Sequence, residues 1–198
     1  MLQHAPLILA SGSTIRQQML KAVGLTFSVE PSGVDEVAVQ QTVSHLPIAE
    51  QALALATAKA VAVGARNPAS YTIGADQICA LGPRIFHKPG SYEAAEAQLA
   101  ALSGHTHQQH CGTVLVHGHE VIFAIHATAS LTMRPLTAAE IRAYVMADAP
   151  LNSCGAYKFE ALGRHLFASV EGDQDVIKGL ALLPLLAALH AQGVIALA

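Results

Sequence analysis

The sequence predicts an α/β protein with a central mixed sheet flanked by helices. Predicted helices and strands alternate through the first half of the chain, and two consecutive strands that turn at a glycine interrupt this pattern in the second half. The 198 residues are 52% hydrophobic and 13% charged, which is enough apolar content for a sizeable core. Because no repeat, low-complexity linker or clear boundary divides the sequence, we expect residues 1–198 to form a single domain, with one or two lobes.

The first half of the chain predicts three strands, two helices and a hairpin. Short apolar or alternating runs indicate the strands, and an alanine-rich run around Lys59 indicates the longer helix. Gly24 stands where a glycine favours the end of the shorter helix. In order, the elements are a buried strand at Leu7–Ala10, a helix at Arg16–Val23, a strand at Thr26–Glu30, a helix at Ile48–Ala65, a strand at Tyr71–Asp76 that ends on an acid, and a hairpin around Gly82-Pro83.

The second half predicts three strands and three helices. Ser91 can cap the first of these helices, and Thr137 with Glu140 forms a capping box that opens the second. Gly118 marks a turn between two antiparallel strands. In order, the elements are a helix from Ser91 to Ser103-Gly104, strands at Gly112–His117 and Val121–Thr132, a helix at Thr137–Met146, a strand at Leu166–Val170, and a C-terminal helix that ends near Gly193.

The C-terminal segment, residues 179–198, carries no charged residue and is long enough for a membrane span. However, Pro184, His190, Gln192 and Gly193 interrupt its apolar pattern, and no basic anchor follows. We therefore expect a helix packed on the protein core and no contact with a membrane.

Charge and cysteine content exclude other classes of protein. The formal net charge is −3 and there is no long basic run, so we expect no binding to nucleic acid. Cys79, Cys111 and Cys154 lie far apart, which argues against a disulfide framework and fits a reducing cytosol. The first residues lack the basic and apolar regions of a signal peptide, so a cytoplasmic location is expected.

A first group of polar residues follows the strand at Leu7–Ala10. Ser11 and Ser13 precede a helix that carries Arg16 in its first turns. Hydroxyl groups, free N–H groups at a helix start and a forked guanidinium can together bind an anion such as phosphate. The alternative is that Ser13 or Thr14 simply caps the helix.

A second group combines acids and lysines. Asp76, at a predicted strand end, and Glu36 can hold a divalent cation, Mg²⁺ or Mn²⁺, because such ions prefer oxygen ligands. A metal-bound water beside a carboxylate base is suited to hydrolysing a phosphoanhydride. Lys59 and Lys88 would then neutralise phosphate charge, although most lysines are solvated surface groups.

Several other sites have little support in the sequence. The patterns GxxxxGK[ST], GxGxxG after a strand, and GxSxG are absent. His105, His107, His110, His117 and His119 have spacings that allow zinc on a strand, but no Cys or acid stands at ligand spacing. We expect most of these histidines to lie on the surface or in a polar part of the core.

With these residues in view, the chain resembles the Maf family of nucleoside triphosphate pyrophosphatases. The resemblance implies an elongated mixed sheet, two lobes with a cleft, a fold related to inosine-triphosphate pyrophosphatases, and hydrolysis of a nucleoside triphosphate to a monophosphate and pyrophosphate. It also implies that Asp76 is the proton acceptor and that Ser11, Arg16, Glu36, Lys59 and Lys88 line the phosphate and metal region. The matching motifs run from Leu7 to about Gly193: LILASGSTIR, VDE, ALATAKA, TIGADQICAL, HKP, LSGHTH, YV…APLNSCGAYKFE and a late GL.

Three positions bear on the substrate. Gln77 and Glu160 resemble the branch that acts on 7-methyl-GTP, whereas the branch that acts on dTTP and UTP has Thr and Gln there. Ile15 departs from both branches, which have Trp or Arg at this position. A carboxylate at 160 suits a cationic 7-methylguanine, because the N1–H and N2–H₂ edge of that base donates hydrogen bonds.

The resemblance leaves alternatives open. The chain can be a dTTP/UTP pyrophosphatase of the same family, a non-catalytic nucleotide-binding inhibitor of septum formation, or a pyrophosphatase of the inosine-triphosphate type. Together, Asp76, Glu36, Lys59 and Lys88 favour catalysis over binding alone. A homodimer is compatible with the sequence. Further departures from the family pattern are His105, Gln17, Asp175, Lys178 and Ala181.

Overall fold

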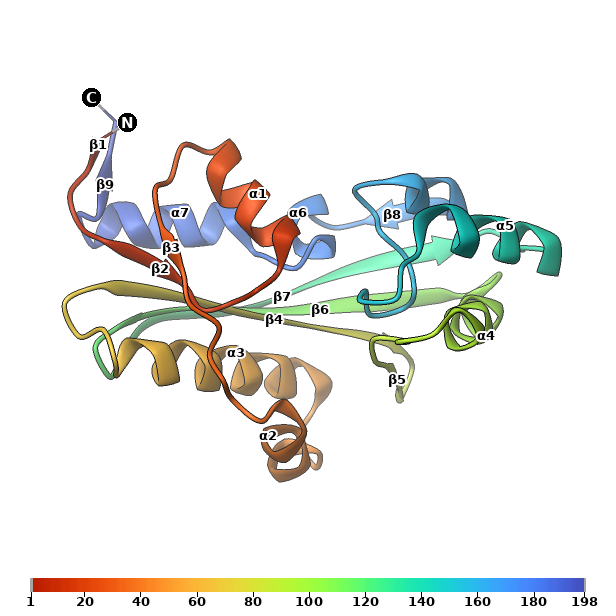
Figure 1. Ribbon diagram of the computed structural model, residues 1–198, viewed down its shortest axis with the longest axis horizontal. Helices are drawn as coiled ribbons and strands as arrows, with labels where there is room; N and C mark the ends of the chain where they lie inside the picture. The colour runs from red at the N-terminus through yellow and green to blue at the C-terminus, as the bar shows by residue number, and fades with distance from the viewer. Residues whose placement is uncertain (1, 198) are drawn as a thin grey trace. The chain divides into compact units, whose positions relative to one another are not determined.

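The computed structural model describes residues 2–197, and its main feature is a mixed β-sheet (Figure 1). The sheet is built from β2 (Leu7–Leu9), β3 (Ser28–Val29), β4 (Tyr71–Leu81), β5 (Arg84–Phe86), β6 (Thr106–His117), β7 (Glu120–Met133) and β8 (Phe167–Glu171). Within the described residues these seven strands pair in the order β3-β2-β4-β6-β7-β8, with β5 beside β4. Strand β2 is parallel to β3 and β4, whereas β5 is antiparallel to β4 and β8 is antiparallel to β7. The predicted α/β class with a mixed sheet is confirmed.

The chain divides into two compact units. Unit 1 contains the chain up to residue 76, residues 111–127 and the chain from residue 179 onward, and unit 2 contains residues 77–110 and 128–178. Strands β4, β6 and β7 therefore each contribute residues to both units. Compact units need not fold separately, so the single domain expected from the sequence stays a prediction.

In unit 1, helices cover both faces of the sheet. Figure 1 shows α1 (Thr14–Ala22) and α7 (Leu182–Ala191) on one face and α3 (Ile48–Gly64) on the other. Neighbouring side chains of β6 point to opposite faces, as strand geometry requires. Leu115 accordingly joins the core beneath α1 and α7, whereas Val114 and Val116 pack with alanines of α3.

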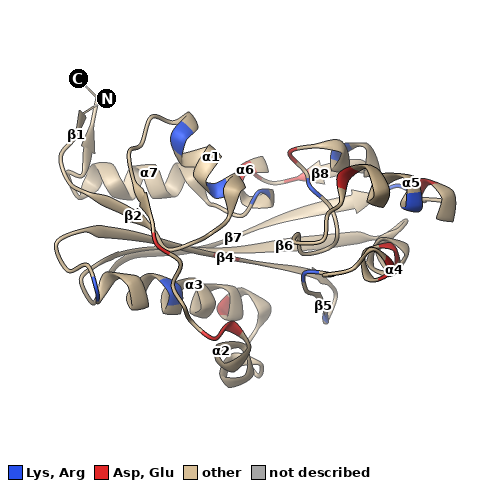
Figure 2. Ribbon diagram, viewed as in Figure 1, with Lys and Arg blue, Asp and Glu red and all other residues tan. Residues whose placement is uncertain are grey.

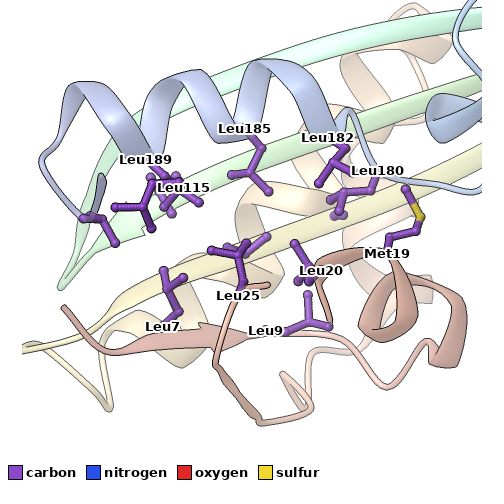
Figure 3. Close-up of a cluster of buried hydrophobic side chains, with 14 residues drawn as sticks. Leu7, Leu9, Met19, Leu20, Leu25, Leu115, Leu180, Leu182, Leu185 and Leu189 are labelled. Carbon is purple, nitrogen blue, oxygen red and sulfur yellow. The ribbon is translucent and has the colours of Figure 1, made fainter. Parts of the chain in front are cut away.

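Helix α7 belongs to the core of unit 1, as expected for the uncharged C-terminal segment. Its Leu185 and Leu189 are fully buried beside Leu7, Leu20 and Leu115 (Figure 3). Figure 2 shows that neither α7 nor β6 carries a Lys, Arg, Asp or Glu. Among the described residues, no helix is both long and apolar enough to cross a membrane. The ends of the described chain pair as β1 (Leu2–Gln3) with β9 (Ile195–Ala196).

Helix α3 approaches the sheet so closely that glycines are needed beneath it. A Cβ atom added at Gly74 of β4 would lie 2.4 Å from the carbonyl oxygen of Ala56 and 2.6 Å from the Cβ of Ala60. One added at Gly112 of β6 would lie 2.5 Å from the carbonyl oxygen of Ala52. These contacts fix the distance between the backbones of α3 and β4.

We expect Gly74→Ala to destabilise the protein by about 1–3 kcal/mol, because the added methyl group forces the backbones of α3 and β4 apart. Chemical denaturation followed by circular dichroism measures this change. Gly12→Ala is the matched control, since a Cβ there meets nothing within 4 Å. Equal stabilities of the two variants would contradict the close packing of α3.

Unit 2 combines capped helices with the outer strands. Helices α4 (Tyr92–Leu102) and α5 (Ala138–Asp148) contact each other. Ser91 caps α4 and Thr137 forms the predicted capping box with Glu140 at the start of α5. The remaining helices of unit 2 are the 3₁₀ helix η1 (Leu162–Leu166) and the single turn α6 (Gln174–Ile177).

Some predicted extents were wrong. Strand β4 continues to Leu81, so Asp76 lies in the middle of a strand and not at its end. Strand β6 starts at Thr106 and not at Gly112. Helix α2 (Glu36–Val43) was missed because it buries no residue and so has no clear apolar period. The short elements α6, η1, β1 and β9 were also missed.

The buried His107 makes unit 2 sensitive to acid. Burial lowers the pKa of His107 from 6.5 to about 4, so between these pH values the unfolded chain binds more protons than the folded one. The free energy of unfolding should therefore fall by ~3 kcal/mol as the pH drops from 6.5 to 4.

Denaturation at several pH values tests this prediction. His126, whose pKa is also lowered by burial, contributes in the same direction. Glu30, Glu93 and Glu140 have lowered pKa values too, but their effects begin only below about pH 4.5. Between pH 4.5 and 6.5 the free energy of unfolding of His107→Phe should change less steeply with pH than that of the wild type. An unchanged slope would contradict the assignment of the acid sensitivity to His107.

Candidate functional site

The centre of the candidate site is the buried ammonium group of Lys59 on α3. Its Nζ lies 2.6 Å from Oδ1 of Asp76 on β4 and 2.9 Å from Oε1 of Glu36 on α2. Lys59 is 7% exposed and Asp76 is 8% exposed, so Lys59 is not a solvated surface lysine. A charge buried to this extent requires partners of opposite sign, and the two carboxylates provide them.

The packing of α3 on β4 brings these residues together. Ala56 and Ala60 contact the backbone at Gly74, which places the neighbouring Lys59 over this part of the strand. Asp76 follows Gly74 by two residues and therefore points to the same face of β4. Glu36 starts α2, and Asp35 caps this helix by accepting a 3.0 Å hydrogen bond from the N–H of Ala38.

Glu36 and Asp76 are the residues that would hold the expected divalent cation. Both contact the ammonium group of Lys59, which occupies the point that their oxygen atoms face. Hard oxygen ligands suit Mg²⁺ or Mn²⁺, and Mg²⁺ often binds through only one or two carboxylates, with water and substrate phosphates completing its shell. Within residues 2–197 no three His, Cys, Asp or Glu side chains are grouped as metal ligands, and this also applies to the histidines of β6.

Arg16 is buried and held by backbone carbonyl groups. Its Nε donates to the carbonyl oxygen of Gly179 at 2.7 Å, and its Nη1 donates to that of Ala75 at 2.8 Å and to Oγ of Ser11 at 3.1 Å. These bonds engage Nε and Nη1 of the guanidinium. Arg16 is thereby tied to the backbone directly before Asp76.

The serines of the first loop have local roles. Oγ of Ser13 caps α1 by accepting from the N–H of Arg16, which is the helix-capping role predicted as the alternative to anion binding. Oγ of Ser11 accepts from the N–H of Ser13 and from Arg16, which shapes the loop around the guanidinium. Ile15 is partly buried against the core of unit 1, so it is not a free surface for a base.

The other predicted site residues belong to unit 2. Lys88 is exposed just after β5, and Glu160 is exposed in the segment that follows α5. Nε2 of Gln77 donates to the carbonyl oxygens of Val176 at 3.0 Å and Ile177 at 2.7 Å. The amide of Gln77 therefore fastens the end of α6, a role with no signal in the sequence.

Comparison with known proteins agrees with the resemblance in the sequence. A family model described as Maf-like protein matches residues 6–192. A relative from Legionella pneumophila (strain Corby), named nucleoside triphosphate pyrophosphatase, is 42% identical over 95% of this chain and 94% of its own length. One of the same name from Rhodopseudomonas palustris (strain BisB18) is 45% identical over 96% of both chains.

A solved structure of a HAM1 protein from Coxiella burnetii has a TM-score of 0.39 and 15% identity, covering 66% of this chain and 73% of its own, a likeness too weak to bear on the fold. The match to the family model instead extends over nearly the whole sequence, and the relatives with more than 40% identity cover the same span. The chain belongs to the Maf-like protein family.

Proposed function

We propose that the protein is a nucleoside triphosphate pyrophosphatase, which hydrolyses a nucleoside triphosphate to its monophosphate and pyrophosphate. The observation that carries this proposal is the contact of the buried Lys59 with both the buried Asp76 and the more exposed Glu36. The names of the relatives from Legionella and Rhodopseudomonas support the same reaction.

In the proposed mechanism Asp76 accepts the proton of the attacking water. Lys59 orients this carboxylate through the 2.6 Å contact, and the low exposure of both groups strengthens the interaction. When bound by Glu36 and Asp76, a divalent cation would polarise water and offset phosphate charge. Nη2 of Arg16 is the group of unit 1 proposed to donate to the triphosphate, and Lys88 stays a predicted phosphate ligand.

The proposed substrate is 7-methyl-GTP or a similar modified purine nucleotide. Glu160 is exposed, and its carboxylate can accept hydrogen bonds from the N1–H and N2–H₂ edge of a cationic guanine. Gln77 contributes indirectly, because its amide nitrogen is engaged with α6. Ile15 has no aromatic ring and is partly buried against the core, so we expect no base stacking at that position.

Pyrophosphate release from a panel of nucleotides tests the proposal. The panel contains 7-methyl-GTP, GTP, dTTP, UTP and inosine triphosphate, each with Mg²⁺ and with a chelator. We expect Mg²⁺-dependent release that is fastest for 7-methyl-GTP. A preference for dTTP or UTP would overturn 7-methyl-GTP as the proposed substrate. If no nucleotide releases pyrophosphate, the proposed activity is overturned in favour of nucleotide binding alone.

The variant Glu160→Gln should lower kcat/KM for 7-methyl-GTP by about tenfold or more, because each charge-assisted hydrogen bond contributes ~1.5–3 kcal/mol. Hydrolysis of dTTP and UTP should be unchanged or faster, since a glutamine offers both a donor and an acceptor to a pyrimidine. Steady-state kinetics measures the ratio of kcat/KM between the variant and the wild type for each nucleotide. Glu171→Gln, at another exposed acid of unit 2, is the matched control.

A further inference from the structure

The segment that carries Glu160 has an unusual backbone. Residues 149–161 of unit 2 connect α5 to η1 without regular structure. Ala149 and Ala156 have φ angles of 43° and 59°, in the left-handed region that residues with a Cβ rarely adopt, and Gly155 lies between them in sequence with φ 80°. Such conformations persist only where surrounding contacts hold them.

Several hydrogen bonds hold the backbone of this segment, including one from Nε of Arg164 to the carbonyl oxygen of Phe159 at 3.0 Å. Two others join it to α5 and to the loop after β5. The N–H of Lys158 donates to the hydroxyl of Tyr144 on α5 at 2.9 Å. The carbonyl oxygen of Leu151 accepts from the N–H of Gly90 at 3.0 Å. The second bond joins the segment to the loop that carries Lys88, so two residues proposed to contact substrate lie on connected loops of unit 2.

A further anchor is buried inside unit 2 and consists of His107, Gln109 and Tyr157. The hydroxyl of Tyr157 lies 2.9 Å from Nε2 of His107 and accepts a 2.7 Å hydrogen bond from Nε2 of Gln109. His107 and Gln109 are 1% exposed and Tyr157 is 4% exposed. Because His107 and Gln109 are two residues apart on β6, their side chains leave the same face of the strand.

Burying this polar cluster costs free energy that an apolar core would not cost. Within residues 2–197, Nδ1 of His107 and Oε1 of Gln109 are buried without a hydrogen bond, and such atoms carry a desolvation penalty. Apolar side chains of similar volume would fill the same space without that penalty. What the polar cluster adds is a fixed direction for the Tyr157 hydroxyl, and hence for the backbone around it.

The imidazole takes part in the cluster as a neutral group. Burial lowers the pKa of His107 to about 4, so the ring carries no charge at neutral pH. The Tyr157 hydroxyl has one proton and can accept from Gln109 while donating to Nε2 of His107. Both contacts to the tyrosine are then satisfied without any charged partner.

We propose that His107 is a positioning residue for base recognition, because its hydrogen bond to Tyr157 fixes the segment that places Glu160. The inference rests on the proposed function, in which Glu160 contacts the base. Tyr157 precedes Glu160 by three residues, and the strained Ala156 lies next to it. Loss of the His107 contact would free this part of the segment while the helices α4 and α5 stay packed.

Product inhibition separates base recognition from phosphate recognition. His107→Phe, which keeps a ring but loses both nitrogens, and Tyr157→Phe should each raise the inhibition constant of 7-methyl-GMP by about fivefold, the equivalent of one net hydrogen bond. The inhibition constant of pyrophosphate should stay within about twofold. The double variant should bind 7-methyl-GMP no more weakly than the single variant with the lower affinity, because both changes remove the contact between His107 and Tyr157.

Two further variants complete the design. His107→Gln keeps hydrogen-bonding groups at this position and should restore part of the affinity for 7-methyl-GMP. His119→Phe, at an exposed histidine in the turn between β6 and β7, should leave both constants unchanged. Equal losses of affinity for 7-methyl-GMP and pyrophosphate, or additive effects in the double variant, would overturn the proposal.

Hydrogen exchange tests the positioning without relying on activity. His107→Phe should increase amide exchange at residues 156–161 and leave α4 protected, whereas general destabilisation would increase both. Unchanged exchange at residues 156–161 would overturn the inference. A wild-type protein that releases no pyrophosphate would instead overturn the proposed function, and the exchange result would still decide whether His107 holds the segment.

Discussion

Asp76→Asn is expected to lower the rate of nucleotide hydrolysis by about 10²–10⁴-fold while leaving the protein folded. Asparagine has nearly the same shape as aspartate but cannot accept the proton of the attacking water. Lys59 keeps a partner in this variant, because Glu36 lies 2.9 Å from its Nζ. The loss of one of two carboxylates should therefore cost far less stability than the loss of the lysine.

Initial rates at saturating nucleotide, with melting temperatures on the same samples, measure both effects. Asp173→Asn is a suitable control because Asp173 caps α6, and asparagine caps helices equally well. The control should retain wild-type activity. If Asp76→Asn hydrolyses nucleotides within a few-fold of the wild-type rate, Asp76 is not the proton acceptor.

Lys59→Met should reduce both stability and activity. Removing the ammonium leaves the buried Asp76 beside Glu36 with no cation between them, and breaking a buried ion pair typically costs about 3–5 kcal/mol. Activity should fall by about 10²–10³-fold, the usual effect of losing one preorganised electrostatic group. Thermal denaturation and pyrophosphate release test the two effects.

The effect of Mg²⁺ on the melting temperature of Lys59→Met is a second test. If Glu36 and Asp76 bind a divalent cation, Mg²⁺ should raise the melting temperature of Lys59→Met more than that of the wild type, because the cation offsets the unpaired carboxylates. The double variant Lys59→Met/Asp76→Asn should recover stability but not activity. Lys21→Met, at an exposed lysine of α1, is the control. A Lys59→Met protein as stable as this control would contradict the buried ion pair.

Local signals in the sequence predicted much of the fold. The caps at Ser91 and Thr137 fixed the starts of α4 and α5, because a capping hydroxyl bonds to its own helix. The alanine-rich run gave α3 at nearly its observed bounds. Lys59 stood out within that run because few charged residues surround it, and its burial follows from the same apolar context.

Contacts between distant residues could not be predicted in the same way. Arg16 bonds to the carbonyl of Gly179, 163 residues away, and a backbone carbonyl leaves no mark on the sequence. The strand was predicted to end on the acid Asp76, whereas β4 continues to Leu81 and stays largely buried beyond it. The expected divalent cation, cytoplasmic location and homodimer stay predictions.

A single-turnover reaction in ¹⁸O-labelled water is the most direct test of the proposed hydrolysis. The wild-type protein, in excess over 7-methyl-GTP and with Mg²⁺ present, is quenched and both products are analysed by mass spectrometry. Attack of water at the α-phosphorus places one ¹⁸O atom in the monophosphate and none in the pyrophosphate, and this is the result we expect. Label in the pyrophosphate, release of orthophosphate in its place, or no turnover at all would contradict a pyrophosphatase centred on Asp76, Lys59 and Glu36.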